Sequence, residues 1–270
     1  MTDNKVLKEI IAAKRKNPYT EDKSIKQLRE ETEVSGSKIP LPENTKIEKI
    51  MADGVHAEWI TCGNVNAEKI FMFIHGGGYY RGSIASTRAT VARISEQAGV
   101  RCLSIDYRLA PEHPFPAAID DTYTVYNWIV KQGINPTNII VSGQSAGGGL
   151  CLALLLKIKD NKGAQPLGAV AISPWTDLSQ SGDTMKTNED IDPIISKKYL
   201  DRMAGLYLKG SPVTLPLASP LFGDLSKLPP ILIQVGTAET MLDDSKRFFE
   251  RAKEAKVDVQ IEVWKDMFHG

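Results

Sequence analysis

The feature that most constrains the fold is a series of short, continuously apolar runs that begins about 70 residues into the chain. Helix-length segments separate most of these runs, which is typical of parallel strands covered by helices on both faces. The runs predict one large α/β domain with a mostly parallel, doubly wound central sheet flanked by helices. They are Ile70–Ile74, Cys102–Ile105, Ile139–Val141, Ala169–Ile172, Ile231–Val235 and Val257–Val263.

Three other regions depart from this rhythm. Residues 46–61 alternate apolar and polar positions around Asp53-Gly54, a pair that tolerates positive φ, and they predict an antiparallel hairpin. Residues 1–45 are charged, with intermittent helical spacing, and precede the core. Residues 180–220 are polar and contain prolines, which indicates an inserted helix or two. We therefore expect an N-terminal segment, 1–45, and a main domain, 46–270, with an insertion at about 180–220.

The balance of charge limits the partners. Lys and Arg number 33, as do Asp and Glu, so no net field favours nucleic acid or an anionic membrane. The N-terminus has no apolar signal region, and no stretch approaches the roughly 18 apolar residues that span a bilayer. The three cysteines lack metal-ligand spacing and indicate reduced, structural thiols. We expect a cytoplasmic protein with a small-molecule substrate.

A G-x-S-x-G motif supplies the candidate nucleophile. Gly143-Gln-Ser-Ala-Gly147 directly follows the apolar run Ile139–Val141 and opens an apolar helical segment. In this strand-turn-helix context the motif predicts a nucleophile elbow, in which glycines permit a strained turn that exposes the serine. The neighbouring helix N-terminus favours developing negative charge. Ser145 is the candidate nucleophile, and the alternative is a glycine-rich packing turn.

A second glycine motif, His75-Gly-Gly-Gly-Tyr79, follows another apolar run. Consecutive glycines let the backbone pass close to a ligand. The N–H groups of Gly77 and Gly78, with that of Ala146, are therefore candidate donors to the oxyanion of a tetrahedral intermediate.

A phosphate-binding loop is the alternative interpretation of these glycines. The sequence contains no G-x-x-x-x-G-K-[ST] motif. Arg81 also stands where a G-x-G-x-x-G motif beginning at Gly76 requires its last glycine. We therefore expect neither a nucleotide cofactor nor a metal ion.

The candidate base follows by elimination among four histidines. His56 lies in the predicted hairpin, His75 in the glycine motif and His113 between prolines. His269 alone follows the last apolar run, and this completes the order serine, acid, histidine. We expect His269 to be the base and the others to be structural, with His75 holding the glycine loop.

The acid must follow the strand that ends at Gly236, so that its carboxylate can orient the imidazole. Glu239 lies in a loop three residues past that strand. Asp243 and Asp244 stand at the start of a helical segment, Ser245–Ala255, where N-capping or the helix dipole explains them. Glu239 is favoured, and the two aspartates remain alternatives.

Six segments together carry a family resemblance, namely His75–Tyr79, Asp106–Glu112, Pro116–Asp120, Gly143–Gly148, Ser173–Leu178 and Leu242–Ser245. Through them the chain resembles, from about residue 45 to the end, the bacterial hormone-sensitive-lipase family of carboxylesterases. The resemblance implies an α/β-hydrolase fold and a helical cap formed by residues 1–45 and 180–220. It also implies a Ser145–Glu239–His269 triad, oxyanion donors at Gly77, Gly78 and Ala146, a homodimer and no cofactor.

This resemblance predicts hydrolysis of short-chain acyl esters through an acyl-enzyme intermediate. An amidase or a lipase remains an alternative, because the fold alone does not choose among them. A non-catalytic small-molecule receptor on the same fold is another, since plant hormone receptors resemble this family. Those receptors lack the catalytic histidine, which is present here as His269.

The sequence departs from the family pattern at two places. The acid position carries Glu239 where many relatives have Asp, and the chain stops at Gly270 where relatives continue into a further helix. Because chain ends fray unless they are tied down, we expect the natural protein to be longer, and His269 to be mobile in a chain that ends here.

Overall fold

The predicted strands assemble into one sheet. The computed structural model describes residues 5–16 and 23–270, and over these residues eight strands pair in the order β1-β2-β4-β3-β5-β6-β7-β8. The pairs from β4 to β8 are parallel, whereas β2 pairs with β1 and β4 antiparallel. The strands are β1 (Thr45–Ala52), β2 (Val55–Cys62), β3 (Asn66–Ile74), β4 (Val100–Ile105), β5 (Ile139–Gln144), β6 (Gly168–Ile172), β7 (Ile231–Gly236) and β8 (Val259–Trp264).

The hairpin predicted for residues 46–61 is confirmed as the pair β1 and β2. Its turn places Asp53 at φ 47° and Gly54 at φ 92°, and both values lie in the left-handed region that this dipeptide tolerates. Each of the six apolar runs also lies in, or overlaps, a strand.

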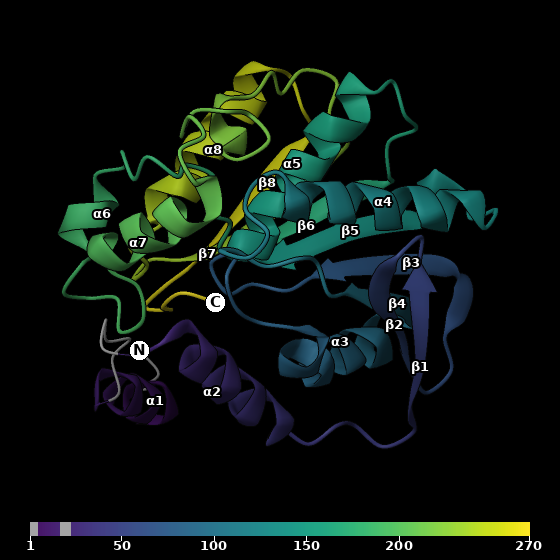
Figure 1. Cartoon of the computed structure of the whole chain (residues 1–270), viewed down its shortest axis with the longest axis horizontal. Helices are drawn as coiled ribbons and strands as arrows, with labels where there is room; N and C mark the ends of the chain where they lie inside the picture. Colours follow the sequence, from purple (N-terminus) through teal and green to yellow (C-terminus); the bar gives the residue numbers. More distant parts are fainter. Residues whose placement is uncertain (1–4, 17–22) are drawn as a thin grey trace.

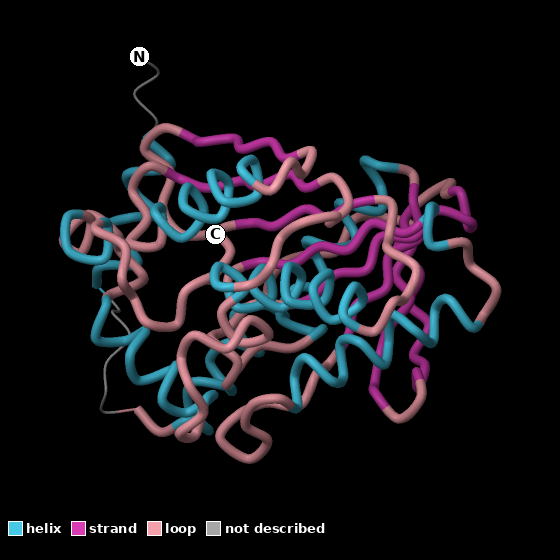
Figure 2. Tube along the Cα trace, turned by 90° about the horizontal axis from the view of Figure 1, so that it is seen from above, coloured by secondary structure: helices cyan, strands magenta, loops and turns pink. Residues whose placement is uncertain are grey.

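Helices cover both faces of the sheet, as Figure 1 shows and as Figure 2 shows from above. The helix α3 (Ile84–Ala98) packs against β2 and β4, below the sheet in Figure 1. The helices α4 (Ala117–Lys131), α5 (Ala146–Asp160) and α8 (Leu242–Glu254) lie on the other side. The helix α5 is buried almost all round, which accounts for its run of leucine and alanine. Two short 3-10 helices are η1 (Pro136–Asn138) and η2 (Pro220–Phe222).

The remaining helices gather at one end of the sheet, on the left in Figure 1. They come from the N-terminal segment, residues 1–45, and from the insertion at about residues 180–220. The first segment contributes α1 (Lys5–Lys16) and α2 (Ile25–Ser37), and the insertion contributes α6 (Thr184–Thr187) and α7 (Lys197–Leu208). We propose that these helices form the cap over the site.

The last strand differs from the prediction of strands buried on both faces. Since β8 is the edge of the sheet, beside β7, most of its side chains face solvent. Val263 is 43% exposed and Trp264 is 53% exposed. The prediction of burial on both faces was wrong here, because Asp258, Gln260 and Glu262 interrupt this apolar segment at alternate positions, which is typical of a strand with one exposed face.

Two sequence observations have direct structural counterparts. Cys62, Cys102 and Cys151 are buried and free, as expected of structural thiols. Among the described residues, no helix is both long and apolar enough to cross a bilayer.

Candidate active site

Ser145 lies at a strained turn between β5 and α5. Its φ of 58° and ψ of −122° place a non-glycine residue in the left-handed half of the backbone map, which costs about 1–3 kcal/mol. The flanking glycines make room for this turn. A Cβ at Gly147 would lie 2.2 Å from the carbonyl oxygen of Ile74, and one at Gly143 would lie 2.1 Å from the carbonyl oxygen of Gly147. The backbone therefore has the form of the predicted elbow.

The structure brings the predicted nucleophile, base and acid together. His269 Nε2 lies 2.9 Å from Ser145 Oγ, and His269 Nδ1 lies 3.0 Å from Glu239 Oε2. When Nδ1–H donates to the carboxylate, Nε2 is left to accept the serine hydroxyl proton. The three residues follow β5, β7 and β8, whose carboxyl ends meet at one edge of the sheet.

Burial and a charged partner act in opposite directions on the base. Burial disfavours the imidazolium and lowers the pKa of His269, but the hydrogen bond and the charge of Glu239 raise it by more. The pKa of His269 therefore lies above its ordinary value of 6.5. His269 is 7% exposed and Glu239 is 1% exposed, so both groups are shielded from solvent.

The two alternative acids have other partners. The helix α8 begins at Leu242, so Asp243 and Asp244 lie inside its first turn, and its N-cap residue, Met241, makes no side-chain cap. N-capping by these aspartates is therefore wrong, because the helix starts three residues earlier than its spacing indicated, whereas the other expectation, an interaction with the helix dipole, agrees with their place in the first turn. Their carboxylates hold neighbouring loops instead: Asp243 Oδ2 accepts from the N–H of Thr184, and Asp244 Oδ2 accepts from the backbone of the loop after β6.

The catalytic-acid candidate is fixed by two donors at its other oxygen. Glu239 Oε1 accepts from the hydroxyl of Ser173 at 2.7 Å and from the N–H of Gly236 at 2.6 Å. Ser173 belongs to a motif that supported the family resemblance, but the sequence did not assign it a role. The available signal was its position directly after the apolar run of β6, since strand ends of a parallel sheet share an edge.

The glycine loop presents two residues with positive φ. Gly77 has φ 114° and Gly78 has φ 61°. His75 stabilises the loop: its Nδ1–H donates to the carbonyl of Gly76 at 2.8 Å, and its ring stacks on Tyr107 with centroids 4.2 Å apart. Burial lowers the pKa of His75, which favours the neutral ring.

Ala146, the third candidate oxyanion donor, lies at the start of a helix as predicted, and His56 and His113 lie in the predicted hairpin and in a loop. Ala146 is the first residue of α5, where the backbone N–H has no partner within the helix. His56 Nδ1 lies 2.8 Å from Asp106 Oδ2, and His113 is exposed in the loop before α4. Neither histidine lines the cavity at Ser145.

A cavity of about 210 Å³ opens onto Ser145 and His269. The glycine loop forms one wall. The N-terminal segment and the insertion contribute side chains to the other walls of the cavity. The sequence analysis did not predict which of their side chains lie there. The lining side chains are Thr32 from α2, Arg81, Ser86, Thr87 and Gln144 from the main domain, and Ile194, Ile195, Tyr199 and Met203 from the insertion.

One face of α7 packs on the glycine loop. The hydroxyl of Tyr199 bonds that of Tyr80, and the ring of Tyr207 stacks on Tyr79 with centroids 3.8 Å apart. Between them, Met203 lies so close to Gly78 that a Cβ there would be 2.0 Å from its Sδ. The contacting residues of α7 are spaced by four, so they share one face of the helix.

Hydrogen bonds hold the backbone around His269. The N–H of Gly270 donates to Ser173 Oγ at 3.3 Å, and the carbonyl of Gly270 accepts from Gln144 Nε2 at 3.2 Å. The carbonyl of Met267 accepts from the N–H of Ala238 at 3.0 Å. The candidate base is thus connected by hydrogen bonds to the segments that carry the candidate nucleophile and the candidate acid.

Comparison with known proteins identifies the family. Residues 71–270 match the α/β hydrolase fold family. An esterase of Acinetobacter venetianus is 38% identical over 233 residues, which make up 85% of this chain and 76% of that protein. An acetyl-hydrolase of Streptomyces hygroscopicus is 38% identical over 213 residues, or 79% of this chain and 71% of that protein.

A solved structure narrows this further. The crystal structure of an esterase from the bacterial hormone-sensitive-lipase family has a TM-score of 0.96 and 40% identity, and the match covers 100% of this chain and 91% of that chain. The chain belongs to this family. Its motifs therefore predicted the hormone-sensitive-lipase family correctly, together with the α/β-hydrolase fold and the hydrolase class of the enzyme.

Proposed function

We propose that this esterase hydrolyses small carboxylic esters through an acyl-enzyme formed on Ser145, with His269 as general base and Glu239 as the carboxylate that orients it. One observation carries the proposal: a continuous hydrogen-bonded chain runs from Glu239 Oε2 through both ring nitrogens of His269 to Ser145 Oγ. A non-catalytic receptor would not need this connection, so the arrangement favours an enzyme.

Acylation uses each group in turn. His269 Nε2 takes the hydroxyl proton while Ser145 Oγ bonds to the ester carbonyl carbon. The carbonyl oxygen becomes an oxyanion, which accepts hydrogen bonds from the N–H groups of Gly77, Gly78 and Ala146. The protonated His269 then gives its proton to the leaving oxygen, the C–O bond breaks, and the alcohol departs.

Deacylation repeats the sequence with water. His269 removes a proton from a water molecule as that water attacks the acyl carbon, and the same backbone donors stabilise the second oxyanion. Collapse of this intermediate returns the proton to Ser145 Oγ and releases the carboxylic acid. Throughout, the negative charge of Glu239 stabilises the imidazolium.

The size of the cavity leads to a prediction on substrate length. At about 210 Å³ it is smaller than the roughly 300–1,000 Å³ of sites for drug-sized ligands. We expect kcat/KM to be highest for acyl groups of about two to six carbons. A panel of p-nitrophenyl esters of increasing acyl length, with the matching anilides, measures this preference. A rate that peaks on long-chain triglyceride emulsions, or equal rates on anilides, would instead support the lipase or amidase alternative.

The pKa of His269 leads to a prediction on pH dependence. Only the neutral imidazole accepts the serine proton, so activity is present above the pKa of His269 and falls as pH drops through it. Since Glu239 raises that pKa, the acid limb of kcat/KM is expected to lie above pH 6.5. In Glu239→Gln, the residual activity should show its limb at lower pH. Initial rates measured across pH at constant ionic strength give the acid limb of the wild type and of the variant. If the two limbs lie at the same pH, the assignment of Glu239 is contradicted.

A further inference from the structure

The loop after β6 contacts the segments of all three proposed catalytic residues. The hydroxyl of Ser173 bonds Glu239, and its oxygen accepts from the N–H of Gly270, beside the base. The N–H of Trp175 donates to the carbonyl of Ser145 at 3.1 Å. The loop is thus placed to control how the acid, base and nucleophile are arranged.

Ser173 is held in an unusual conformation within this loop. It is 2% exposed, and its φ of 46° lies in the left-handed region, which is uncommon for a residue with a side chain. Its N–H donates to the carbonyl of Gln234 on β7 at 2.7 Å. Such a conformation persists only where the surroundings impose it. Here it directs the single hydroxyl proton of Ser173 to Glu239 Oε1.

The carboxylate of Glu239 depends on such a contact for its orientation. The terminal torsion of a glutamate is broad, so the side chain does not fix the plane of its own carboxylate. With Oε1 bonded to Ser173 and Gly236, Oε2 is directed at His269 Nδ1. Of the two donors to Oε1, the backbone N–H remains in every variant, whereas the hydroxyl can be removed by substitution.

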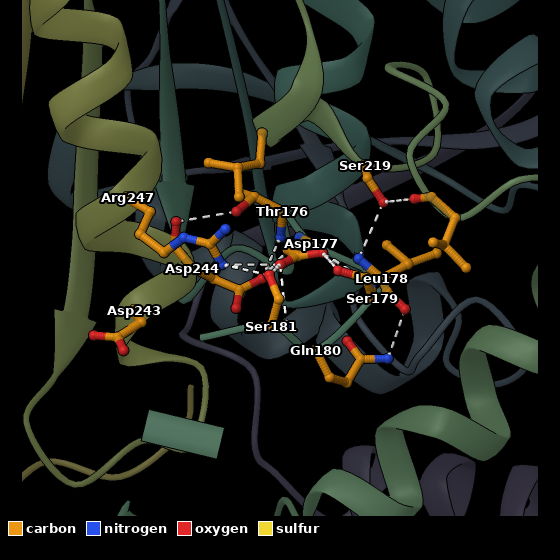
Figure 3. A network of polar contacts seen from close by, with 12 residues as sticks. Thr176, Asp177, Leu178, Ser179, Gln180, Ser181, Ser219, Asp243, Asp244 and Arg247 are labelled. Carbon is orange, nitrogen blue, oxygen red and sulfur yellow. Dashed lines mark hydrogen bonds and ion pairs between the residues drawn. The ribbon is translucent and has the colours of Figure 1, made fainter. Parts of the chain in front are cut away.

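The far end of the loop is clamped to the helix that follows the acid. Asp244 Oδ2 accepts from the N–H groups of Thr176 and Asp177, each at 2.8 Å, as Figure 3 shows. The carboxylate of Asp177 in turn bonds Arg247 of α8 at 2.9 Å. Burial raises the pKa of Asp244 to about 8, and the clamp remains because either form of the carboxyl can accept. The N–H of Leu242, the first residue of α8, donates to the carbonyl of Glu239 at 3.3 Å, so Glu239 and the loop of Ser173 are both attached to α8.

We propose that Ser173 is a positioning residue for ester hydrolysis: its hydroxyl fixes the carboxylate plane of Glu239 so that the carboxylate holds His269 in line with Ser145. The inference rests on the proposed function, because it has meaning only if Glu239 orients the base. Ser173 is buried and does not line the cavity at Ser145, so its loss should lower kcat and leave KM unchanged.

A double-mutant cycle on kcat tests the inference. Ser173→Ala should lower kcat by about tenfold, since a small displacement of a catalytic group is costly, with KM within about twofold of the wild-type value. In a Glu239→Gln background the same substitution should change kcat by less than about twofold, because the carboxylate that Ser173 positions is gone. A purely structural role would lower activity equally in both backgrounds, and that result would overturn the inference.

Two further variants separate positioning from folding. Ser173→Gly also removes the hydroxyl, but glycine adopts positive φ without steric strain, so this variant should fold about as stably as the wild type while losing as much kcat as the alanine variant. Ser104→Ala is the matched control: this serine is 1% exposed, and its hydroxyl has no hydrogen-bond partner among the described residues. Its kcat should equal the wild-type value. A Ser173→Gly variant with wild-type kcat would overturn the inference.

The same double-mutant cycle shows whether the role of Ser173 or the proposed catalytic triad has failed. If Glu239→Gln keeps wild-type kcat, the proposed triad fails and the inference fails with it. If Glu239→Gln is impaired but neither Ser173 variant is, the triad stands and only the role of Ser173 is refuted.

Discussion

Ser145→Ala is expected to abolish ester turnover while leaving the fold intact. In the proposed mechanism the hydroxyl forms the covalent bond to the acyl group, and in another serine hydrolase loss of the nucleophile lowers kcat on the order of a million-fold. Alanine keeps the Cβ, so the packing of the elbow is little changed. The comparison of kcat/KM on p-nitrophenyl acetate between wild type and variant measures the loss, and the thermal midpoint checks the fold.

Covalent labelling gives an independent readout of the same residue. An organophosphate should add one phosphoryl group to the wild type, on the peptide that contains Ser145, and none to the alanine variant. Ser142→Ala is a suitable control, because Ser142 lies on β5 three residues earlier, is fully buried and has a hydroxyl with no partner among the described residues. It should keep both turnover and labelling. Turnover retained in Ser145→Ala would exclude the acyl-enzyme mechanism.

Glu239→Gln is expected to lower kcat by about 10³- to 10⁴-fold. The amide carries no charge to stabilise the imidazolium, and if its NH₂ group faces Nδ1 the histidine adopts the tautomer that cannot accept the serine proton. Because glutamine has the shape of glutamate, the buried site should keep its packing. Steady-state kinetics at a pH above the pKa of His269 isolates this effect from simple protonation of the base.

Asp243→Asn is the matched control for that variant. It makes the same change of charge four residues away, but the Asp243 carboxylate accepts from the N–H of Thr184 and has no bond to His269. We expect nearly wild-type kcat and a change in the free energy of unfolding of about 1 kcal/mol or less. If Asp243→Asn loses activity and Glu239→Gln does not, the acid has been assigned to the wrong residue.

Much of the fold and the site could be predicted because the deciding signals are local in sequence. The apolar runs marked the buried strands, and the glycines around Ser145 are required by close backbone contacts at a sharp turn. The order of the strands along the chain then left few places for an acid and a base. Position favoured Glu239 and His269 as acid and base, since each follows a parallel strand whose carboxyl end lies at the same edge of the sheet as that of β5.

Other features depend on contacts that sequence spacing does not reveal. The side chains that line the cavity come from α2 and from the insertion, and nothing in either segment indicates which face packs over Ser145. The aspartates of α8 were explained by N-capping or the helix dipole because both roles fit locally, whereas their hydrogen-bond partners are backbone groups 59 and 68 residues earlier in the chain. The role of Ser173 likewise appears only when β6 and β7 lie side by side.

The packing of α7 on the glycine loop bears on how an ester reaches Ser145. Tyr199, Met203 and Tyr207 contact three consecutive residues of that loop, so an outward swing of α7 as a lid would disturb the proposed oxyanion donors. Interfacial activation requires a lid that an oil–water boundary can open. In this enzyme, opening such a lid would dismantle part of the catalytic apparatus, so its rate should follow the concentration of dissolved ester and show no jump when the ester forms droplets.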